Sequence, residues 1–575
     1  MAKSRASRQA RRLLPGAAVF SAYQRGWLRG DLLAGATVAA YAIPQVMAYA
    51  TVAGLPPVVG LWAILPPLAL YALLGSSRQM SVGPESTTAL MTAAVVGSLA
   101  AGDPVRYAQL AAGLAGLVGV LCIVCWAARL GFVADLLSRP ILVGYLAGVA
   151  LIMIMGQLGK LTGVPVSGET FLPRLVSFIR DLPQAHTGTL LFAGAVLAFL
   201  FVVQWRFRTA PGPLMAVLLA TAAVSIFGLE HLGIHVVGDI PAGLPRPSLP
   251  SIDLEDLLLP AFGVLIVGYT DNMLTARSFA VRHDEEIDPN QELLALGTAN
   301  VGAGLLQGFP VSSSASRTSL GDAAGSRTQL FSLVVLAAVL AVLLFLGPLL
   351  EQFPDAALGA IVVYAAVRLI DLPGFGRLAR FRRSELLLAF GSLAGVLVFD
   401  ILYGVLLAVA LSVVVMLARI ARPHDAIQGL VPGLAGMHDI DDYADARTVP
   451  GLVVYRYDAP LFFANADDFR QRALAAVDGH DGTVAWFVLN VEANVEVDIT
   501  GLDAVEALRR ELDRRGIVFA LARVKQDLLD QLNAYGLTAS IGREGIFPTL
   551  PTAVAAYEEW RAHHPRPEPP PSATT

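Results

Sequence analysis

Two short segments, far apart in the chain, interrupt apolar sequence in the same way. One is Met80-Ser-Val-Gly-Pro-Glu-Ser-Thr-Thr-Ala-Leu-Met91, and the other is Gln307-Gly-Phe-Pro-Val-Ser-Ser-Ser-Ala-Ser-Arg-Thr-Ser319. In each, an extended piece with Gly and Pro leads into a helix start that is rich in hydroxyl side chains. A helix broken inside a membrane exposes backbone N–H groups, which is tolerated only where protein or a water-filled cavity satisfies them. Because helix N-termini attract anions, two such breaks in corresponding places predict a transporter's anion-binding site.

Composition places most of the chain in a membrane. Of its 575 residues, 55% are hydrophobic and 15% charged, and the mean hydropathy is +0.61. Soluble domains carry about 25% charged residues. We expect a basic cytoplasmic tail without a signal peptide's features (1–30), a transmembrane anion transporter domain (31–425), an α/β domain (435–565) and a disordered tail (566–575). The two cysteines, Cys122 and Cys125, have no further ligands nearby, so we expect packing rather than metal or redox chemistry.

Apolar stretches, two of them short at 84 and 314, predict fourteen membrane spans in two sets of seven. The first set is 31–51, 57–75, 84–101, 107–128, 140–160, 189–205 and 212–228. The second is 257–275, 291–306, 314–325, 328–349, 356–370, 385–400 and 402–420. The interrupted segments begin the third member of each set, and an odd number of spans per repeat inserts the second repeat upside down, as in secondary transporters. If the N-terminus is cytoplasmic, Arg residues gather on the inside loops, and the C-terminus also lies inside.

The hydrophilic C-terminal part predicts a sheet covered by helices, because strand-like and helix-like runs alternate along it. The expected strands are Leu452–Tyr457, Val484–Val491, Ile517–Leu521 and Ile546–Phe547. The expected helices are Ala466–Val477, Leu502–Arg515, Gln526–Tyr535 and a last one near Pro551–His563.

Ionisable residues deep in predicted spans are functional candidates, because a charge inside the bilayer is costly. They are Glu85, Asp271 and Arg317. Arg317 follows the second break at once, where a guanidinium beside a helix N-terminus makes an anion cradle with the hydroxyls of Ser314 and Ser316. The alternative is a structural arginine paired with Glu85 or Asp271, and the two roles are compatible.

Glu85 lies on the first turn of the other half-helix, next to Ser86. As an N-terminal carboxylate it can simply complement the helix dipole. As a fixed anion beside an anion site it repels substrate until it is protonated, which makes it a proton-coupling candidate. Asp271, with Thr275 one turn on and on the same face, suits a coupling site for H⁺ or Na⁺. A plain salt bridge from Asp271 to Arg317 is the alternative.

The first span contains a proline, Pro44, which frees a carbonyl and can bend the helix. Gln45 and Tyr49 are one turn apart, so both can face a cavity, although a packing role for Tyr49 fits equally well.

Three stretches near the start resemble the sulfate permease family. They are Asp31-Leu-Leu-Ala-Gly-Ala-Thr37, Ile43-Pro-Gln-Val-Met-Ala-Tyr49 and Gly54-Leu-Pro-Pro-Val-Val-Gly-Leu-Trp62. Both interrupted segments agree with this resemblance, which spans nearly the whole chain. It implies a fold of seven plus seven inverted spans split into a core and a gate domain, a cytoplasmic STAS domain and a homodimer.

The resemblance also implies roles for individual residues. The anion site would involve Gln45, Tyr49, Glu85, Ser316 and Arg317, and Asp271 would be the carboxylate that couples H⁺ or Na⁺. In prestin-like animal members the position of Glu85 is aromatic, so the acid here favours coupled uptake. In the STAS domain Thr500 matches a residue that is phosphorylated in anti-sigma-factor antagonists, although this pattern also serves as a helix N-cap. The substrate-binding candidates are therefore Gln45, Tyr49, Glu85, Ser86, Ser314, Ser316 and Arg317, and the coupling candidates are Asp271, Thr275 and Glu85.

These features predict a multi-pass cell-membrane protein that imports an anion, sulfate first, with H⁺ or Na⁺. Bicarbonate or a C4-dicarboxylate stays open as substrate, and so does an uncoupled exchanger or channel. A membrane-anchored STAS sensor is a candidate from a different class. We expect no cofactor, no metal and no nucleic-acid partner, and an enzyme is least favoured because no nucleophile–base or metal-ligand motif is found.

Overall fold

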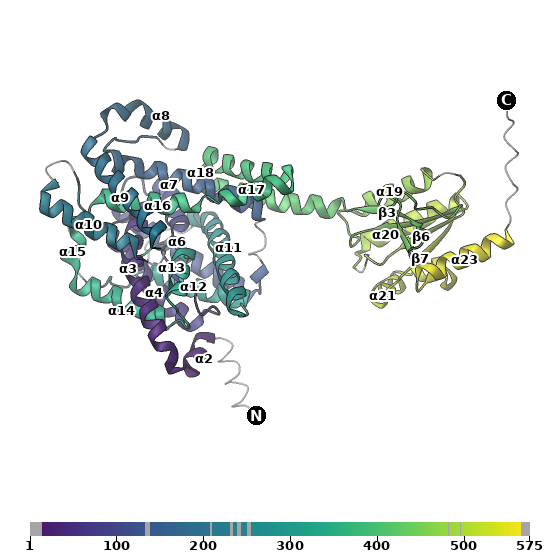
Figure 1. The fold of residues 1–575 in the computed structure, drawn as a ribbon. Coiled ribbons are helices and arrows are strands. Elements are labelled where there is room, and N and C mark those ends of the chain that lie inside the picture. Colours follow the sequence, from purple (N-terminus) through teal and green to yellow (C-terminus); the bar gives the residue numbers. More distant parts are fainter. Residues whose placement is uncertain are drawn as a thin grey trace. The chain divides into compact units, whose positions relative to one another are not determined.

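The computed structural model describes residues 14–132, 138–168, 170–207, 210–229, 234–238, 243–249, 255–480, 482–494 and 496–564. The chain divides into two compact units, residues 1–412 and 413–575. Figure 1 shows the first unit as a bundle of helices and the second as a small α/β unit. The predicted disordered tail, 566–575, lies outside the described residues.

Helices of the membrane unit overlap every predicted span. The first half contains α2 (Pro15–Ser21), α3 (Leu28–Val52), α4 (Pro57–Leu74), α5 (Ser86–Leu99), α6 (Pro104–Ala127), α7 (Arg139–Thr162), α8 (Phe171–Asp181), α9 (Thr187–Arg206) and α10 (Gly212–Phe227). The second half contains α11 (Leu258–His283), α12 (Pro289–Leu305), α13 (Ala315–Ala323), α14 (Leu330–Phe345), α15 (Gly347–Glu351), α16 (Asp355–Leu369), α17 (Leu372–Phe381) and α18 (Arg383–Ala421). Seven helices within the described residues are long and apolar enough to cross a membrane.

The last two predicted spans both lie in α18, which is helical across 39 residues but is not a straight rod. In a straight helix, residues eight apart are about 12 Å apart along the axis. A Cβ placed on Gly404 would instead lie 2.8 Å from the Cα atom of Val396. The chain therefore folds back on itself between Val396 and Gly404, and the two predicted spans are two arms of one element.

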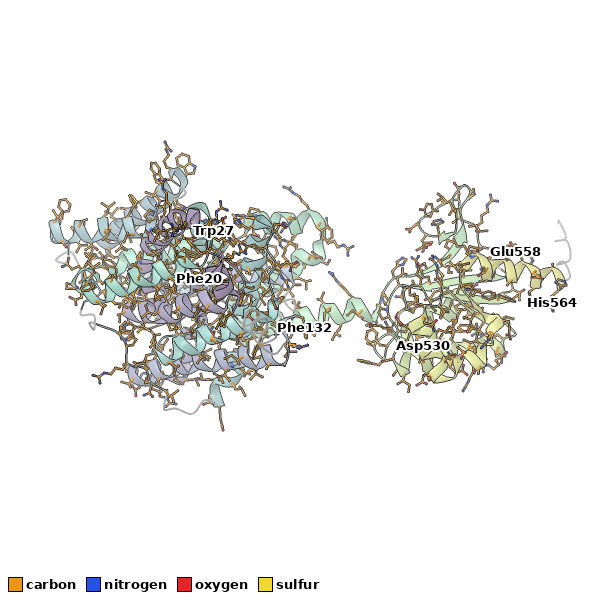
Figure 2. The ribbon with its side chains drawn as sticks, turned by 90° about the horizontal axis from the view of Figure 1, so that it is seen from below. Phe20, Trp27, Phe132, Asp530, Glu558 and His564 are labelled. Carbon is orange, nitrogen blue, oxygen red and sulfur yellow. The ribbon has the colours of Figure 1, made fainter. Side chains whose placement is uncertain are left out.

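Small residues bring the membrane helices into backbone contact, as expected where lipid supplies no hydrophobic driving force between them. A Cβ on Gly60 of α4 would lie 1.9 Å from the carbonyl oxygen of Val46 on α3. Gly297 of α12 lies against α6, where its Cβ would be 3.0 Å from that of Cys122. Cys122 and Cys125 are both free thiols, and Cys122 takes part in this packing. Figure 2 shows side chains filling the space between the helices of the membrane unit.

The two interrupted segments meet in the structure. The strand β1 (Val82–Gly83) precedes α5, β2 (Ser312–Ser313) precedes α13, and the two strands pair antiparallel, Val82 with Ser313 and Gly83 with Ser312. The amide of Ser314 continues the ladder by donating to the carbonyl oxygen of Ser81 at 2.9 Å. The helix N-termini of α5 and α13 are therefore held side by side, as expected from the sequence.

Contacts with neighbouring helices fix the second break. The side chain of Asn300 on α12 forms two reciprocal bonds with the backbone of Val311, at 2.9 and 3.0 Å. The hydroxyl of Ser312 donates to the carbonyl oxygen of Gly268 on α11 at 2.7 Å. These polar side chains satisfy backbone groups that a broken membrane helix would otherwise leave unpaired.

The second unit contains a six-stranded sheet in the order β4-β3-β5-β6-β7-β8. Its strands are β3 (Asp425–Leu430), β4 (Met437–Asp439), β5 (Leu452–Tyr457), β6 (Trp486–Asn490), β7 (Val518–Ala522) and β8 (Ile546–Phe547). Its helices are α19 (Ala466–Asp478), α20 (Ile499–Arg514), α21 (Gln526–Tyr535), α22 (Leu537–Ile541) and α23 (Leu550–His563). The four strands from β5 to β8 are mutually parallel, whereas β3 and β4 pair antiparallel and were not expected from the sequence.

Side chains of β5 alternate between the two faces of this sheet, as the two-residue period of a strand requires. Val453 and Tyr455 join the core that includes Phe469 of α19 and Leu508 of α20. Val454 points to the opposite face, where α23 packs. Figure 2 labels Glu558 on that last helix and His564 directly after its end. The unit thus has its own hydrophobic core on each face of the sheet.

Candidate functional site

A cavity of about 880 Å³ lies in the membrane unit where the two half-helices begin. One wall comes from α3, the start of α5, α11 and α13, and the other from α7, α9 and α16. The lining residues are Tyr41, Gln45, Tyr49, Glu85, Thr87, Leu146, Phe201, Gln204, Trp205, Asp271, Ala315, Ser316, Ser319, Leu320, Ala323, Tyr364, Ala365, Arg368 and Leu369. Five of the predicted site residues thus face one space: Gln45, Tyr49, Glu85, Asp271 and Ser316.

Glu85 is the N-cap residue of α5 and caps its own helix. Its carboxylate accepts a 3.0 Å hydrogen bond from the amide of Thr87 and a further bond from the hydroxyl of Ser86. Ser86 is fully buried and does not line the cavity. The Glu85 carboxylate already occupies the amides at the positive end of this half-helix. A substrate anion can use the same amides only if Glu85 moves away or is protonated.

The second half-helix, α13, carries no such acid. Its N-cap residue, Ser314, makes no capping hydrogen bond through its side chain. The Ser314 hydroxyl instead lies 3.2 Å from that of Ser316, and Ser314 itself is fully buried. Ala315 and Ser316, on the first turn of α13, face the cavity. The positive end of α13 is therefore the part of the site best placed to receive an anion.

Arg317 is fully buried and lies behind the cavity wall rather than in the lining. Its Nη1 donates to the carbonyl oxygen of Pro84 at 2.9 Å and to the side-chain oxygen of Gln45 at 3.1 Å. Its Nε donates to the hydroxyl of Ser81 at 3.3 Å. These partners are all neutral, and Nη2 has no hydrogen-bond partner among the described residues. The guanidinium thus adds positive charge to the junction of the half-helices and forms no direct salt bridge with a carboxylate among the described residues.

The first span supplies polar side chains from one face of α3. Tyr41, Gln45 and Tyr49 recur at a spacing of four residues and all line the cavity. The Gln45 amide nitrogen donates to the Tyr49 hydroxyl at 3.0 Å, while the Gln45 oxygen accepts from Arg317. Pro44 lies within α3, next to this polar face.

Asp271 extends from α11 into the same cavity as Glu85. The hydroxyl of Ser313, on the strand just before α13, donates to its carboxylate at 3.4 Å. Thr275, one turn further along α11, is buried and is not part of the lining. Two carboxylates therefore share one cavity, whereas the predicted partner Thr275 lies apart from it.

The opposite wall contains residues that sequence reasoning assigned no role in the site. Arg368 of α16 is an exposed cation in the lining, and its Nη1 donates to the hydroxyl of Tyr364 at 2.9 Å. The ring of Phe201 on α9 meets the ring of Tyr364 edge-on at 5.1 Å. Arg368 was visible in the sequence near the end of a predicted span, where snorkelling to the interface or a topological role was the favoured explanation.

Two further buried carboxylates, Glu292 and Asp31, connect helices of the membrane unit by hydrogen bonds and do not line the cavity. Glu292 of α12 is fully buried and accepts hydrogen bonds from the Tyr71 hydroxyl, from the Ser76 amide and hydroxyl, and from the Asn272 side chain. Glu292 thereby connects α4, α11 and α12. Asp31, on α3, is also fully buried and accepts from the amides and hydroxyl at the start of the segment leading into α14. Glu292 falls at the edge of a predicted span, where no role was assigned to it.

Thr500 is exposed on the first turn of α20. The cap of this helix is Asp498, whose carboxylate accepts from the amides of Gly501 at 2.8 Å and Phe463 at 2.9 Å. The hydroxyl of Thr500 is therefore not needed as a cap and is accessible for modification.

Comparisons with known proteins agree with this architecture. The model of the sulfate permease family matches residues 28–392, and the STAS domain model matches residues 443–553. A probable sulfate transporter of Mycobacterium tuberculosis strain H37Rv is 60% identical over 547 residues, which cover 94% of this chain and 98% of that protein. A high affinity sulfate transporter of Stylosanthes hamata is 29% identical over 559 residues, 92% of this chain and 83% of that protein.

Solved structures share the fold. Murine solute carrier 26 family member A9, an anion transporter in the inward-facing state, aligns with a TM-score of 0.87 and 25% identity, covering 95% of this chain and 94% of that chain. The transmembrane domain of a cyanobacterial bicarbonate transporter aligns with a TM-score of 0.60 and 25% identity, covering 68% of this chain and 98% of that chain.

Proposed function

The chain belongs to the sulfate permease family of anion transporters, and we propose that it imports a small oxyanion, sulfate first, together with H⁺ or Na⁺. The observation that carries this proposal is the pairing of β1 with β2, which sets the starts of α5 and α13 at one cavity. The relatives named as sulfate transporters support sulfate as the first substrate to test.

The substrate would bind at the start of α13. An oxyanion there accepts hydrogen bonds from the first amides of α13 and from the hydroxyl of Ser316, while Gln45 and Tyr49 offer polar groups from the facing helix. Arg317, one layer behind, holds Gln45 in place and adds positive potential. This arrangement suits a tetrahedral or planar oxyanion, because each of its oxygens can accept a separate hydrogen bond.

Coupling would come from the two carboxylates that share the cavity. Glu85 and Asp271 both repel an incoming anion while ionised. A proton on either carboxylate, or Na⁺ bound at Asp271, removes that repulsion, so anion and cation favour each other's binding. This reciprocity is what accumulation against a gradient requires.

Alternating access would move the wall formed by α3, α5, α11 and α13 relative to the wall formed by α7, α9 and α16. These walls correspond to the core and gate domains expected for the family. We further propose a multi-pass protein of the cell membrane with both termini in the cytoplasm, which follows the positive-inside distribution of Arg. A homodimer is proposed on the family resemblance alone.

A second candidate substrate is bicarbonate, because a cyanobacterial bicarbonate transporter shares the membrane fold. The other candidates are a C4-dicarboxylate as substrate, an uncoupled exchanger and a STAS-based sensor. Each predicts a different outcome in the uptake assay described next. Phosphorylation of Thr500 would be a regulatory addition to any of them.

The experiment is uptake of radiolabelled sulfate, bicarbonate and fumarate into proteoliposomes, at two pH values and with or without a Na⁺ gradient. Protein-free liposomes set the background. We expect saturable sulfate uptake that an inward H⁺ or Na⁺ gradient accelerates. If neither gradient changes the rate, coupling is refuted and the uncoupled exchanger is left. If no anion enters, transport itself is refuted in favour of the sensor.

A further inference from the structure

A short basic helix, α17, lies on the membrane unit directly after α16. Asp371 caps it by accepting from the amide of Gly374 at 2.8 Å. Its buried face is small: Gly374 and Leu378 turn inward, and Leu378 packs with Val143 of α7 and Ala389 of α18. Figure 1 shows α17 beside α18 and α7. Phe375 is half-buried beside this cluster and lies 5.4 Å from the ring of Phe390, and the remaining residues of the helix are exposed.

Four arginines occupy that remaining surface and the start of α18. Arg377, Arg380, Arg382 and Arg383 are all exposed. Between residues 371 and 390 the only acidic residues are Asp371, which caps the helix, and Glu385, which is half-buried. Four positive and two negative charges leave this stretch with a net charge of +2, on the side of the membrane that the proposed topology assigns to the cytoplasm.

Large apolar side chains stand exposed next to these charges. Phe381 is 65% exposed, and on the first turns of α18 Leu387 is 70% and Phe390 51% exposed. Arg382 lies over the ring of Phe381 at 5.4 Å. Along a helix that rises 1.5 Å per residue, Phe390 is about 10 Å further along α18 than Arg383. The arginines are thus placed to meet the headgroup of a phospholipid, and the apolar side chains further along α18 are placed to meet its acyl chains.

We propose that this surface, α17 with the first turns of α18, binds an anionic phospholipid of the inner leaflet. The guanidinium groups pair with the phosphate of the headgroup, which a planar fork of N–H donors recognises in a bidentate manner. The acyl chains lie along Leu387 and Phe390. Basic residues immediately beside a membrane helix attract anionic lipids in this way, whereas a zwitterionic headgroup offers them no net charge.

Lipid binding here would act on the transport cavity. Only Ile370 and Asp371 separate α17 from α16, and Arg368 and Leu369 at the end of α16 line the cavity. A lipid that holds α17 at the membrane surface therefore also holds this end of the cavity wall. This consequence rests on the proposed function, but the binding itself does not.

Native mass spectrometry of the purified full-length chain tests the binding without reference to transport. The protein in detergent receives equal amounts of a phosphatidylglycerol and a phosphatidylcholine of the same acyl composition. The variant R377Q/R380Q/R382Q/R383Q removes the four charges. The variant R106Q/R174Q/R180Q/R246Q is the matched control, because it removes four arginines that are predicted to lie on the opposite side of the membrane.

We expect the wild-type chain to bind phosphatidylglycerol at least tenfold more than phosphatidylcholine, the α17 variant to lose this preference, and the control variant to keep it. Equal binding of both lipids by the wild type overturns the proposal. So does a preference that survives in the α17 variant or disappears equally in the control. If α17 instead contacts a second copy of this chain, the α17 variant should bind as much lipid as the wild type but appear at the mass of a monomer rather than a dimer. That result also overturns the proposal. If lipid binds as expected but no anion is transported, only the proposed function fails.

Discussion

The guanidinium of Arg317 donates a 3.1 Å hydrogen bond to the side-chain oxygen of Gln45, although 272 residues separate them in the chain. This bond fixes which end of the Gln45 amide faces Tyr49, because the oxygen is occupied and the nitrogen must donate. The same Nη1 also reaches the carbonyl oxygen of Pro84, just before the first half-helix. Arg317 on α13 therefore orients the Gln45 side chain on α3 and binds the backbone just before α5.

Replacing Arg317 with alanine should lower the initial rate of sulfate uptake at least tenfold. The change leaves the Gln45 oxygen and the Pro84 carbonyl oxygen buried without donors, at a cost of about 1–3 kcal/mol each. It also removes the positive charge behind the site. The measurement is uptake into proteoliposomes at matched protein density, with Arg106→Ala, an exposed residue, as the control.

Arg317→Lys separates the two effects. Lysine keeps the charge but lacks the planar fork that serves Gln45, Pro84 and Ser81 together. We expect intermediate uptake. Wild-type uptake by Arg317→Ala would remove Arg317 from the transport site altogether.

The pairing of the half-helices could be predicted because broken membrane helices leave a local signature. Gly, Pro and hydroxyl residues stand out in apolar sequence, and the backbone groups they free need a common partner. The position of Arg317 behind the wall was not predictable, since sequence spacing places a residue on a helix face but does not say what lies between it and the cavity. Arg368 was missed for the same reason: its role depends on α16 facing α3, a contact between distant parts of the chain.

The C-terminal unit shows a different limit of prediction from the sequence. Its parallel strands, β5 to β8, were visible because runs of buried β-branched and aromatic residues alternate with amphipathic helices. The antiparallel strands β3 and β4 were not. Their residues have mixed polarity, and β3 comes soon after a long helix. What makes β3 a strand is its antiparallel pairing with β5, which runs from Asp425 opposite Tyr457 to Gln428 opposite Val454.

Asp271→Asn should abolish accumulation driven by a cation gradient while leaving sulfate exchange at equal concentrations on both sides. The amide keeps the size and can accept from Ser313, but it neither binds a proton nor carries the charge that Na⁺ requires. Accumulation and counterflow are measured on the same proteoliposomes. Thr275→Val is the paired variant, since Thr275 lies on the same helix but outside the cavity lining, and it should accumulate sulfate normally. Normal accumulation by Asp271→Asn would assign coupling to another group.

Arg368→Gln should raise the KM for sulfate several-fold and change kcat much less. Arg368 is the exposed cation of the lining, so its field raises the local anion concentration before the substrate reaches α13. Such steering is screened by salt. The difference in KM between wild type and variant should therefore shrink as ionic strength rises. A KM difference that does not depend on salt would instead mean that Arg368 contacts the bound anion.

Gly83→Val should prevent the two half-helices from meeting. A Cβ on Gly83 would lie 2.8 Å from Cγ1 of Ile64 and 3.3 Å from Nη2 of Arg317, in the strand that pairs with β2. We expect poor yield of folded protein and a Tm lower by several degrees. Gly97→Ala, within α5, is the control: nothing lies within 4 Å of its Cβ, and alanine favours the helix by up to about 1 kcal/mol. An undisturbed Tm in Gly83→Val would mean that the junction adapts to a larger side chain.

The last prediction concerns the stability of the C-terminal unit and its dependence on pH. Glu506 on α20 accepts hydrogen bonds from Arg509 at 2.7 and 3.0 Å and from Arg510 at 2.7 Å, which lowers the pKa of this carboxyl group. A lowered folded-state pKa stabilises the fold fully above the unfolded value of about 4.3, and this contribution is lost as pH falls through the folded-state pKa. The two ion pairs within α20, Glu506 with Arg509 and Glu506 with Arg510, each contribute roughly 0.2–0.5 kcal/mol to the free energy of unfolding. Glu506→Gln should therefore lower the Tm of the unit by about 1–4 °C at pH 7, and the difference from wild type should vanish at strongly acidic pH. A Tm difference that persists unchanged below the folded-state pKa would mean that packing of the Glu506 side chain, not its charge, stabilises α20.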